Sequence, residues 1–190
     1  MKKIFLAGTA LVFFVACNNS GKDKTTTDTT TTSETNRMDT TTKGPVDDAT
    51  RTFMTTIANS GMAEVQVASI AKDKAQNAAV KDFAAMLFRD HSAVNDQVKS
   101  MASQRNIALP DSISADKKKM IDDLNKKSGK DFDKEFLSAM IKGHEAGISL
   151  FENAATSDPD ADVRNFAGQT LPKLREHRDS AMALQKKYFK

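Results

Sequence analysis

The residues best suited to chemistry are the three histidines of the sequence, His91, His144 and His177. Each lies among apolar residues that recur every three to four positions, which is the spacing of the buried face of a helix. Glu64 holds a similar place in a fourth segment of this kind. An ionisable side chain on a buried face is unusual unless it is paired or binds a ligand. The pattern therefore singles out four polar groups, one from each of four helices.

Three imidazoles and one carboxylate together can bind one divalent ion of zinc, iron or copper. One hypothesis is such a site, formed by Glu64, His91, His144 and His177. The favoured interpretation is a metal-free layer of hydrogen-bonded polar groups that sets the register of the helices. A third interpretation is a pH sensor, in which imidazoles that become protonated near about pH 5 to 6 repel one another and loosen the bundle.

An acidic residue adjoins each histidine in the sequence, namely Asp90, Glu145 and Glu176. Adjacent side chains on a helix point about 100° apart, so none of these acids shares the direction of its own histidine. Each is a candidate to orient a histidine on a neighbouring helix by a hydrogen bond. Otherwise these acids are surface carboxylates.

The apolar spacing predicts four long helices, over 47–73, 76–106, 131–156 and 159–188, and a short helix over 114–127. No segment alternates polar and apolar residues as a strand does, so the fold class is all-α. Asp131 and Asp158 are predicted N-caps, with Pro159 at the first helical position. Pro172 is predicted to kink the last helix or to loosen its hydrogen bonds.

The connections predict the topology. Short connections join the first two and the last two long helices, so each pair forms an antiparallel hairpin. About 24 residues separate the second long helix from the third, enough to cross the whole bundle. The prediction is a ferritin-like four-helix bundle whose long crossover contains the short helix. The histidines and Glu64 lie within about 6 Å of mid-height, at about 1.5 Å per residue, and so converge. Gly143 and Gly147 are interpreted as positions of close helix packing.

The first 46 residues predict that the protein is located at the cell envelope. Residues 1–16 resemble a lipoprotein signal peptide, with Lys2 and Lys3 before about 13 apolar residues. Cys17 follows small residues, as the lipid-bearing cysteine of a lipobox does. Residues 17–46 hold that cysteine and a threonine-rich tether with too few apolar groups to fold. We expect an outer-membrane lipoprotein that meets the membrane through its lipid anchor, on the periplasmic face rather than the cell surface.

Composition argues against several other functions. The net charge is +3, and it falls to about +1 without Lys2 and Lys3. The basic run at 117–119 has acidic residues on both sides, so it indicates a solvated helix face rather than a nucleic-acid surface. The single cysteine excludes an internal disulfide and any cysteine-based zinc or haem motif. There is no nucleophile elbow and no phosphate loop, so a non-enzymatic role is favoured over an enzymatic one.

Several motifs together resemble the domain-of-unknown-function 4142 family. They are the block Ser60-Gly61-Met62-Ala63-Glu64-Val65, the pairs Asp90-His91 and His144-Glu145, and the segment Leu171-Pro172-Lys173-Leu174-Arg175-Glu176-His177. The resemblance implies an exported helical bundle, related to the ferritin-like superfamily, with no established activity. The Glu-x-x-His pairs of di-iron proteins are missing, because Phe88, Ile141 and Leu174 stand three residues before the histidines. A mononuclear metal site is therefore favoured over a di-iron site.

Two functional hypotheses follow from these patterns. In the first, a lipid-anchored envelope protein uses its bundle in a structural, stress-related or partner-binding role, with a protein partner that the sequence does not identify. In the second, the bundle is a metal-binding or metal-dependent redox protein with a site at mid-height.

Overall fold

A computed structural model describes residues 45–189, which form five α-helices and no strand. The helices are α1 (Asp48–Lys74), α2 (Ala78–Gln104), α3 (Ala115–Asn125), α4 (Gly129–Ser157) and α5 (Ala161–Tyr188). The all-α fold class is confirmed, and each predicted helix end lies within two residues of the observed one. None of the helices in 45–189 has the length and apolar character needed to span a bilayer. The predicted signal peptide over 1–16, Cys17 and nearly all of the tether over 17–46 lie outside the described residues.

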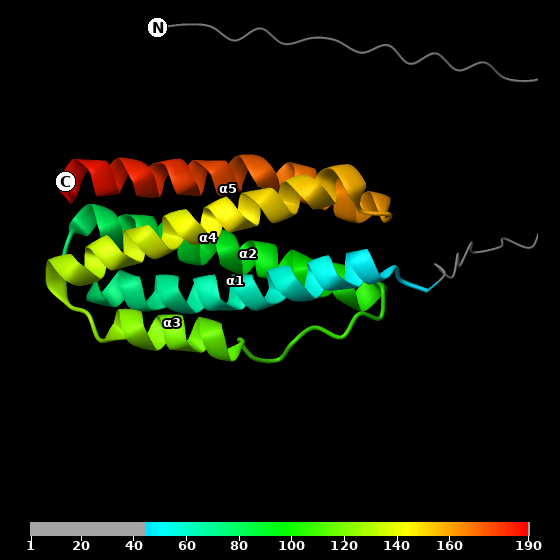
Figure 1. Cartoon of the computed structure of the whole chain (residues 1–190), viewed down its shortest axis with the longest axis horizontal. Coiled ribbons are helices and arrows are strands. Elements are labelled where there is room, and N and C mark those ends of the chain that lie inside the picture. The colour runs from blue at the N-terminus through cyan, green and yellow to red at the C-terminus, as the bar shows by residue number, and fades with distance from the viewer. Residues whose placement is uncertain (1–44, 190) are drawn as a thin grey trace, which may run out of the picture. The chain divides into compact units, whose positions relative to one another are not determined.

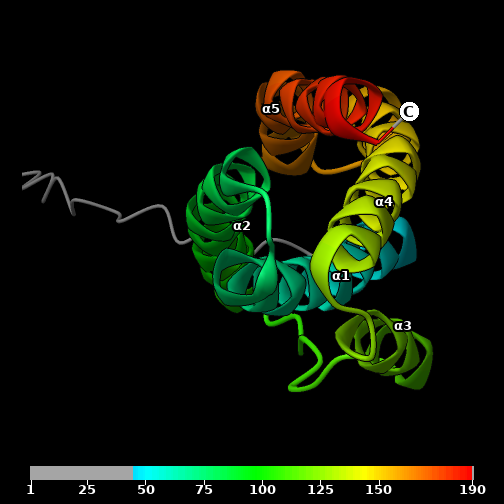
Figure 2. The ribbon, with the colours of Figure 1, turned by 90° about the vertical axis from the view of Figure 1, so that its left-hand side faces the viewer.

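The four long helices form the predicted ferritin-like bundle. In the end-on view of Figure 2, α1, α2, α5 and α4 surround one interior, and α3 lies outside it beside α1 and α4. Figure 1 shows that α1 and α2 form one antiparallel hairpin and that α4 and α5 form the other. The chain between α2 and α4 runs the length of the bundle and carries α3, so α2 and α4 are parallel (Figure 1). The long crossover is thereby confirmed.

The helix starts follow the capping rules, but two of the predicted caps are wrong. Asp47 and Asn77 cap α1 and α2 by accepting the amides of Ala49 and Ala79. The N-cap of α5 is Asp160, not Asp158, which instead closes α4. The N-cap position of α4 is Ser128, so the predicted cap Asp131 lies within the first turn.

Pro172 does not interrupt α5, which runs as one helix from Ala161 to Tyr188. The apolar residues around the proline, including Leu171 and Leu174, stay buried in the bundle. Tertiary packing on this helix therefore outweighs the hydrogen bond that a proline ring removes.

The core consists of two apolar clusters, one toward each end of the bundle. The first lies toward the end of α1 and the start of α4, and it includes Leu87, Phe132, Phe136 and Leu137. The second lies toward the start of α1 and the end of α4, and it includes Met54, Val98, Phe151 and Val163. The three histidines belong to neither cluster and are buried at heights between them.

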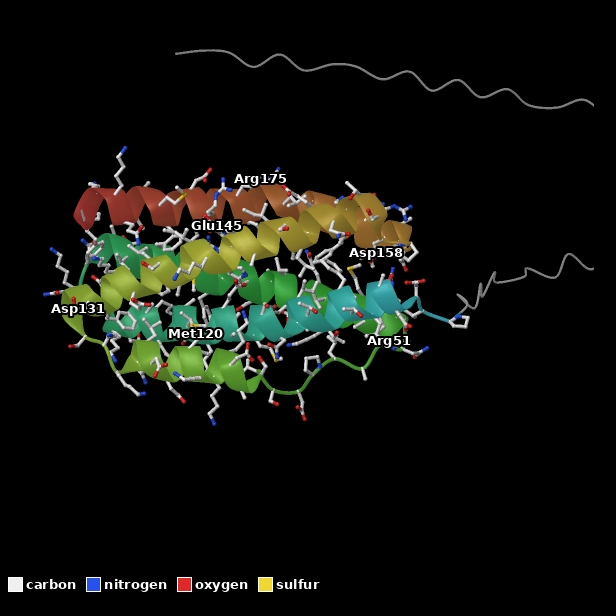
Figure 3. The ribbon with its side chains drawn as sticks, viewed as in Figure 1. Arg51, Met120, Asp131, Glu145, Asp158 and Arg175 are labelled. Carbon is white, nitrogen blue, oxygen red and sulfur yellow. The ribbon has the colours of Figure 1, made fainter. Side chains whose placement is uncertain are left out.

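Buried polar contacts link the two hairpins at both ends. At one end, the Asp133 carboxylate of α4 accepts the amides of Gln76 and Asn77 in the turn between α1 and α2, at 2.9 and 2.8 Å. At the other end, Thr50 of α1 donates to Asp158 at 2.6 Å, where α4 ends (Figure 3). A buried carboxylate needs such donors to offset its lost hydration. These contacts therefore favour one relative placement of the hairpins.

Arg105, directly after α2, joins α2 to the start of α5. Its side chain is 2% exposed, and its guanidinium donates to Asp160 at 2.8 and 2.9 Å and to Asp162 at 2.9 Å. The same guanidinium donates to the Met101 carbonyl at 3.1 Å. The Arg105 guanidinium holds the pKa of Asp160 well below its usual range.

We predict that Arg105→Ala lowers the free energy of unfolding by roughly 2 kcal/mol or more, because it removes one partner of a largely buried ion pair. Arg175→Ala is the matched control: Arg175 pairs with Glu152 on the surface, where both side chains are about half exposed. That change should cost less than about 1 kcal/mol. Denaturant titration of both variants measures the difference, and equal losses would contradict a special role for Arg105.

Candidate metal centre

Three histidines from three helices meet inside the bundle. His91 of α2, His144 of α4 and His177 of α5 are 4%, 1% and 1% exposed. Nε2 of His144 lies 3.3 Å from Nε2 of His91 and 3.3 Å from Nδ1 of His177. One nitrogen from each ring contributes to a group in which all three atoms lie within 4.8 Å of one another. The three rings therefore turn one nitrogen each toward a common point.

The other nitrogen of each ring faces an acceptor outside this group. Nδ1 of His91 lies 3.1 Å from Oε2 of Glu64, and Nε2 of His177 lies 3.1 Å from Oδ2 of Asp90. Nδ1 of His144 lies 2.8 Å from the carbonyl oxygen of Met140, one turn earlier in α4. We call these three the outer nitrogens, and the three that face one another the inner nitrogens.

These acceptors decide where the ring protons lie. A carbonyl oxygen only accepts, so Nδ1 of His144 must carry its hydrogen, and ionised carboxylates impose the same on the outer nitrogens of His91 and His177. A neutral imidazole carries one N–H, so each inner nitrogen presents a lone pair. When all three rings are neutral, three lone pairs therefore face one another in a buried space, and the rings form no hydrogen bond with one another. A cation between them, either a proton or a metal ion, removes this repulsion.

The donor set fits a first-row metal ion. Imidazole nitrogens bind zinc, copper, iron and nickel, and a ligand histidine usually donates its second N–H to a carboxylate or a carbonyl. Around a tetrahedral ion with bonds of about 2.0–2.1 Å, two ligand nitrogens lie about 3.3 Å apart. The two inner N···N distances of His144 are both 3.3 Å. Within residues 45–189, this is the group of metal-binding side chains that the structure brings together.

The electrostatics keep His144 and His177 neutral at physiological pH. Burial is the main cause that lowers the pKa of His144, and the nearby His91 imidazole adds to it. Burial also lowers the pKa of His177 to about 4, against the opposing hydrogen bond to Asp90. Burial raises the pKa of Asp90, but the hydrogen bond from His177 and the charge of Arg89 outweigh it, so the net pKa is lowered. Neutral imidazoles and an ionised carboxylate are the states that metal binding requires.

The predicted site residues separate into three groups. His91, His144 and His177 form the centre itself. Glu64, predicted as a fourth ligand, instead lies 3.1 Å from the outer nitrogen of His91, and its side chain is 20% exposed. Asp90 contacts His177 on the neighbouring helix α5, in the orienting role that the sequence predicted for it. Glu145 and Glu176 are exposed and contact none of the three rings; Glu145 is labelled on α4 in Figure 3, and Glu176 pairs with Lys173.

Sequence reasoning missed the Met140 carbonyl, which orients His144. The signal was present in the chain, because a histidine within a helix has the carbonyl of the residue four positions earlier within reach of its Nδ1. This acceptor cannot lose its role by protonation, unlike the two carboxylates. His144 is therefore the ring whose orientation depends least on the surrounding helices.

Comparisons with known proteins agree with this fold. A sequence model of a family described as a domain of unknown function, DUF4142, matches residues 35–184. The crystal structure of a DUF305 fragment from Deinococcus radiodurans is similar with a TM-score of 0.67 and 14% identity, over 75% of this chain and 99% of that one. CopM in its Cu(I)-bound form has a TM-score of 0.64 and 16% identity, over 74% and 97% of the two chains. Its Cu(II)-bound form has the same TM-score and identity, over 73% and 97%.

Identities this low show a shared fold and nothing finer. No curated protein matches the chain significantly.

We predict that the metal-free protein loses stability as the pH falls from 7.5 to 5, by about 2 kcal/mol for His177 alone. The pKa of His177 is lower in the folded protein than in the unfolded chain, so the unfolded chain binds more protons in this range and gains relative stability. Denaturant titration at both pH values in the presence of a chelator measures the loss. His177→Gln should remove that part of it, and equal stability of the wild type at the two pH values would contradict the buried neutral imidazole.

Proposed function

The chain belongs to the DUF4142 family, and we propose that its bundle binds one first-row transition-metal ion through His91, His144 and His177. The observation that carries this proposal is the orientation of the three rings. Their outer nitrogens face Glu64, Asp90 and the Met140 carbonyl, and their inner nitrogens face one another. A metal ion is the partner that three converging lone pairs can all bind at once.

The metal-free polar layer is the competing function for the same residues. A layer that only sets helix register would be stabilised by donors facing acceptors. Here each inner nitrogen faces another acceptor, so the layer lacks internal hydrogen bonds unless one ring takes a second proton. Burial opposes that protonation at His144 and at His177. The ring geometry therefore favours metal binding over a purely structural layer.

Copper is the ion we propose first. Divalent copper binds nitrogen ligands more tightly than the other first-row divalent ions do, and zinc comes next as a candidate. CopM, which shares the fold, holds copper in both of its oxidation states. A set of three neutral imidazoles without a thiolate suits either ion.

The metal site is proposed to work at the cell envelope. Cys17 follows an apolar segment in the manner of a lipoprotein, and the tether up to residue 46 separates it from the bundle. We propose that the mature chain is held at the outer membrane by lipid on Cys17, with the bundle in the periplasm. The role that fits is non-enzymatic binding of a metal ion close to the membrane.

We predict that protein purified without an affinity tag binds one copper ion per chain and unfolds at a higher temperature when loaded. His144→Leu should abolish binding but leave a folded bundle, because leucine fills a similar volume in a buried position. Equilibrium dialysis with elemental analysis, together with thermal unfolding, measures both effects. If neither copper nor zinc binds in stoichiometric amount to the folded wild type, the proposal fails.

The acidic residues provide a matched set for this experiment. Glu64→Gln and Asp90→Asn should each weaken copper binding by about 10- to 100-fold, because these carboxylates orient ligand histidines. Glu145→Gln and Glu176→Gln remove the same charge from exposed positions beside ligand histidines and should leave the affinity unchanged. Equal effects in both pairs would indicate a general charge effect.

We predict that Cys17→Ser releases the protein from the membrane fraction into the soluble envelope fraction, because the lipid acceptor is lost. Fractionation of cells that express the full chain, with labelling by a fatty acid, measures attachment and acylation together. If Cys17→Ser leaves the membrane fraction unchanged, or if the wild type takes up no label, the proposed lipid anchor is wrong. Neither result would bear on the proposed metal site.

A further inference from the structure

A pocket of about 180 Å³ adjoins the three histidines. All three rings line it, together with the carboxylates Glu64 and Asp90 that orient two of them. Its lining also includes exposed residues, among them Thr56 of α1 and Ala146 of α4. The pocket therefore connects the buried centre with the surface along the neighbouring helices α1 and α4.

The two sides of the histidine centre differ sharply in packing. One turn from each ring toward the first apolar cluster stand Leu87, Met140 and Ala181, all of them 3% exposed or less and part of that cluster. One turn toward the other end stand Val94, Gly147 and Leu174, and all three line the pocket. A metal ion bound by three imidazoles commonly keeps a further position for an exogenous ligand. The side toward the pocket has room for such a ligand.

Two glycines of α4 keep this side open. The sequence indicates close helix packing at Gly143 and Gly147, and the structure corrects that interpretation. A Cβ atom at Gly147 would have no heavy atom within 4 Å, and one at Gly143 would make an ordinary 3.6 Å contact with Glu64. Glycine inside a helix costs roughly 0.5–1 kcal/mol relative to alanine. No helix contact explains that cost at Gly147, whereas the space that this glycine leaves belongs to the pocket.

The pocket walls favour a small neutral ligand. Ile57, Val94, Leu150 and Leu174 make most of the wall apolar, and an engineered apolar cavity of about 150 Å³ holds a molecule as large as benzene. The charged groups nearest the rings are the carboxylates of Glu64 and Asp90, each 3.1 Å from a ring nitrogen. Lys117 and Lys173 also line the pocket, and with the two carboxylates they leave its walls without net charge. An ion that entered would lose its hydration on burial without a wall of opposite charge to offset that loss.

We infer that the metal centre has an open coordination position facing this pocket, and that it binds a small neutral molecule that enters between α1 and α4. This inference rests on the proposed metal site. It adds a ligand class, a route of access and a residue, Gly147, that controls the route without contacting the metal.

Carbon monoxide bound to the Cu(I)-loaded full chain tests this inference. The wild type should give a C–O stretching band in the infrared spectrum, at one carbon monoxide per copper. Gly147→Ala, Gly147→Val and Gly147→Leu place increasingly large side chains in the pocket. Their affinity for carbon monoxide should fall in that order, by roughly tenfold or more for leucine, because the side chain occupies the ligand's space. The copper content should stay at one per chain.

Gly168→Leu is the matched control, since Gly168 is an exposed glycine of α5 whose Cβ would also meet nothing. It should leave carbon monoxide binding unchanged. Azide should not compete with carbon monoxide, and competition would overturn the preference for a neutral ligand.

The outcomes separate the two proposals. If the wild type binds copper but no carbon monoxide, the open position is refuted and the metal site stands. If it binds neither copper nor zinc, both proposals fail. If the affinity for carbon monoxide is unchanged across the Gly147 variants, the proposed entry route between α1 and α4 is refuted. Loss of copper in parallel with loss of carbon monoxide also refutes it, because the substitutions would then act on the ion.

Discussion

The structure depends on one constraint, which is the orientation of three buried histidine rings. When these rings are neutral, three imidazole lone pairs face one another. Each ring is prevented from turning by an acceptor on its far side, and one of these acceptors is the backbone carbonyl of Met140. Neutral rings in this arrangement cannot satisfy one another. The arrangement therefore becomes favourable when a cation occupies the middle, which converts three repelling lone pairs into three bonds.

The rest of the fold holds these rings in place. Apolar clusters on both sides of the histidine centre supply the burial that stabilises the bundle, and the centre itself contributes little apolar area. Asp133 at one end, with Asp158 and Arg105 at the other, links the two hairpins through buried hydrogen bonds. Because His91 belongs to one hairpin and His144 and His177 to the other, the spacing of the inner nitrogens depends on these links. A metal site distributed in this way would in turn stabilise the pairing of the hairpins.

The asymmetry around the histidine centre would allow a bound metal ion to exchange ligands as well as to hold the fold together. A structural metal is normally enclosed on all sides by protein ligands, whereas a reactive or exchanging metal keeps one side open. On one side the chain places Leu87 and Met140 in the first apolar cluster, and on the other it places Gly147 beside Val94 and Leu174. The side chains are smaller on the pocket side of the centre than on the other side. This difference in side-chain volume, rather than any difference in ligand type, allows the pocket to reach the histidines.

Much of the architecture could be predicted from the sequence. Apolar spacing located five helices to within two residues, and the long connection before α4 indicated the crossover. The same spacing placed each histidine on a buried face at mid-height, which is why their convergence was predictable.

The contacts between helices could not be predicted in this way. Asp90 orients a ring while Glu145 and Glu176 face solvent, although all three adjoin a histidine in the sequence. Glu64, predicted as a ligand, orients His91 instead. Asp160 rather than Asp158 caps α5, where it also pairs with Arg105 from a distant segment. The space beside Gly147 depends on how far α1 stands from α4. Periodicity records which face of a helix is buried, whereas the rotation, height and separation of neighbouring helices arise only when all four pack together.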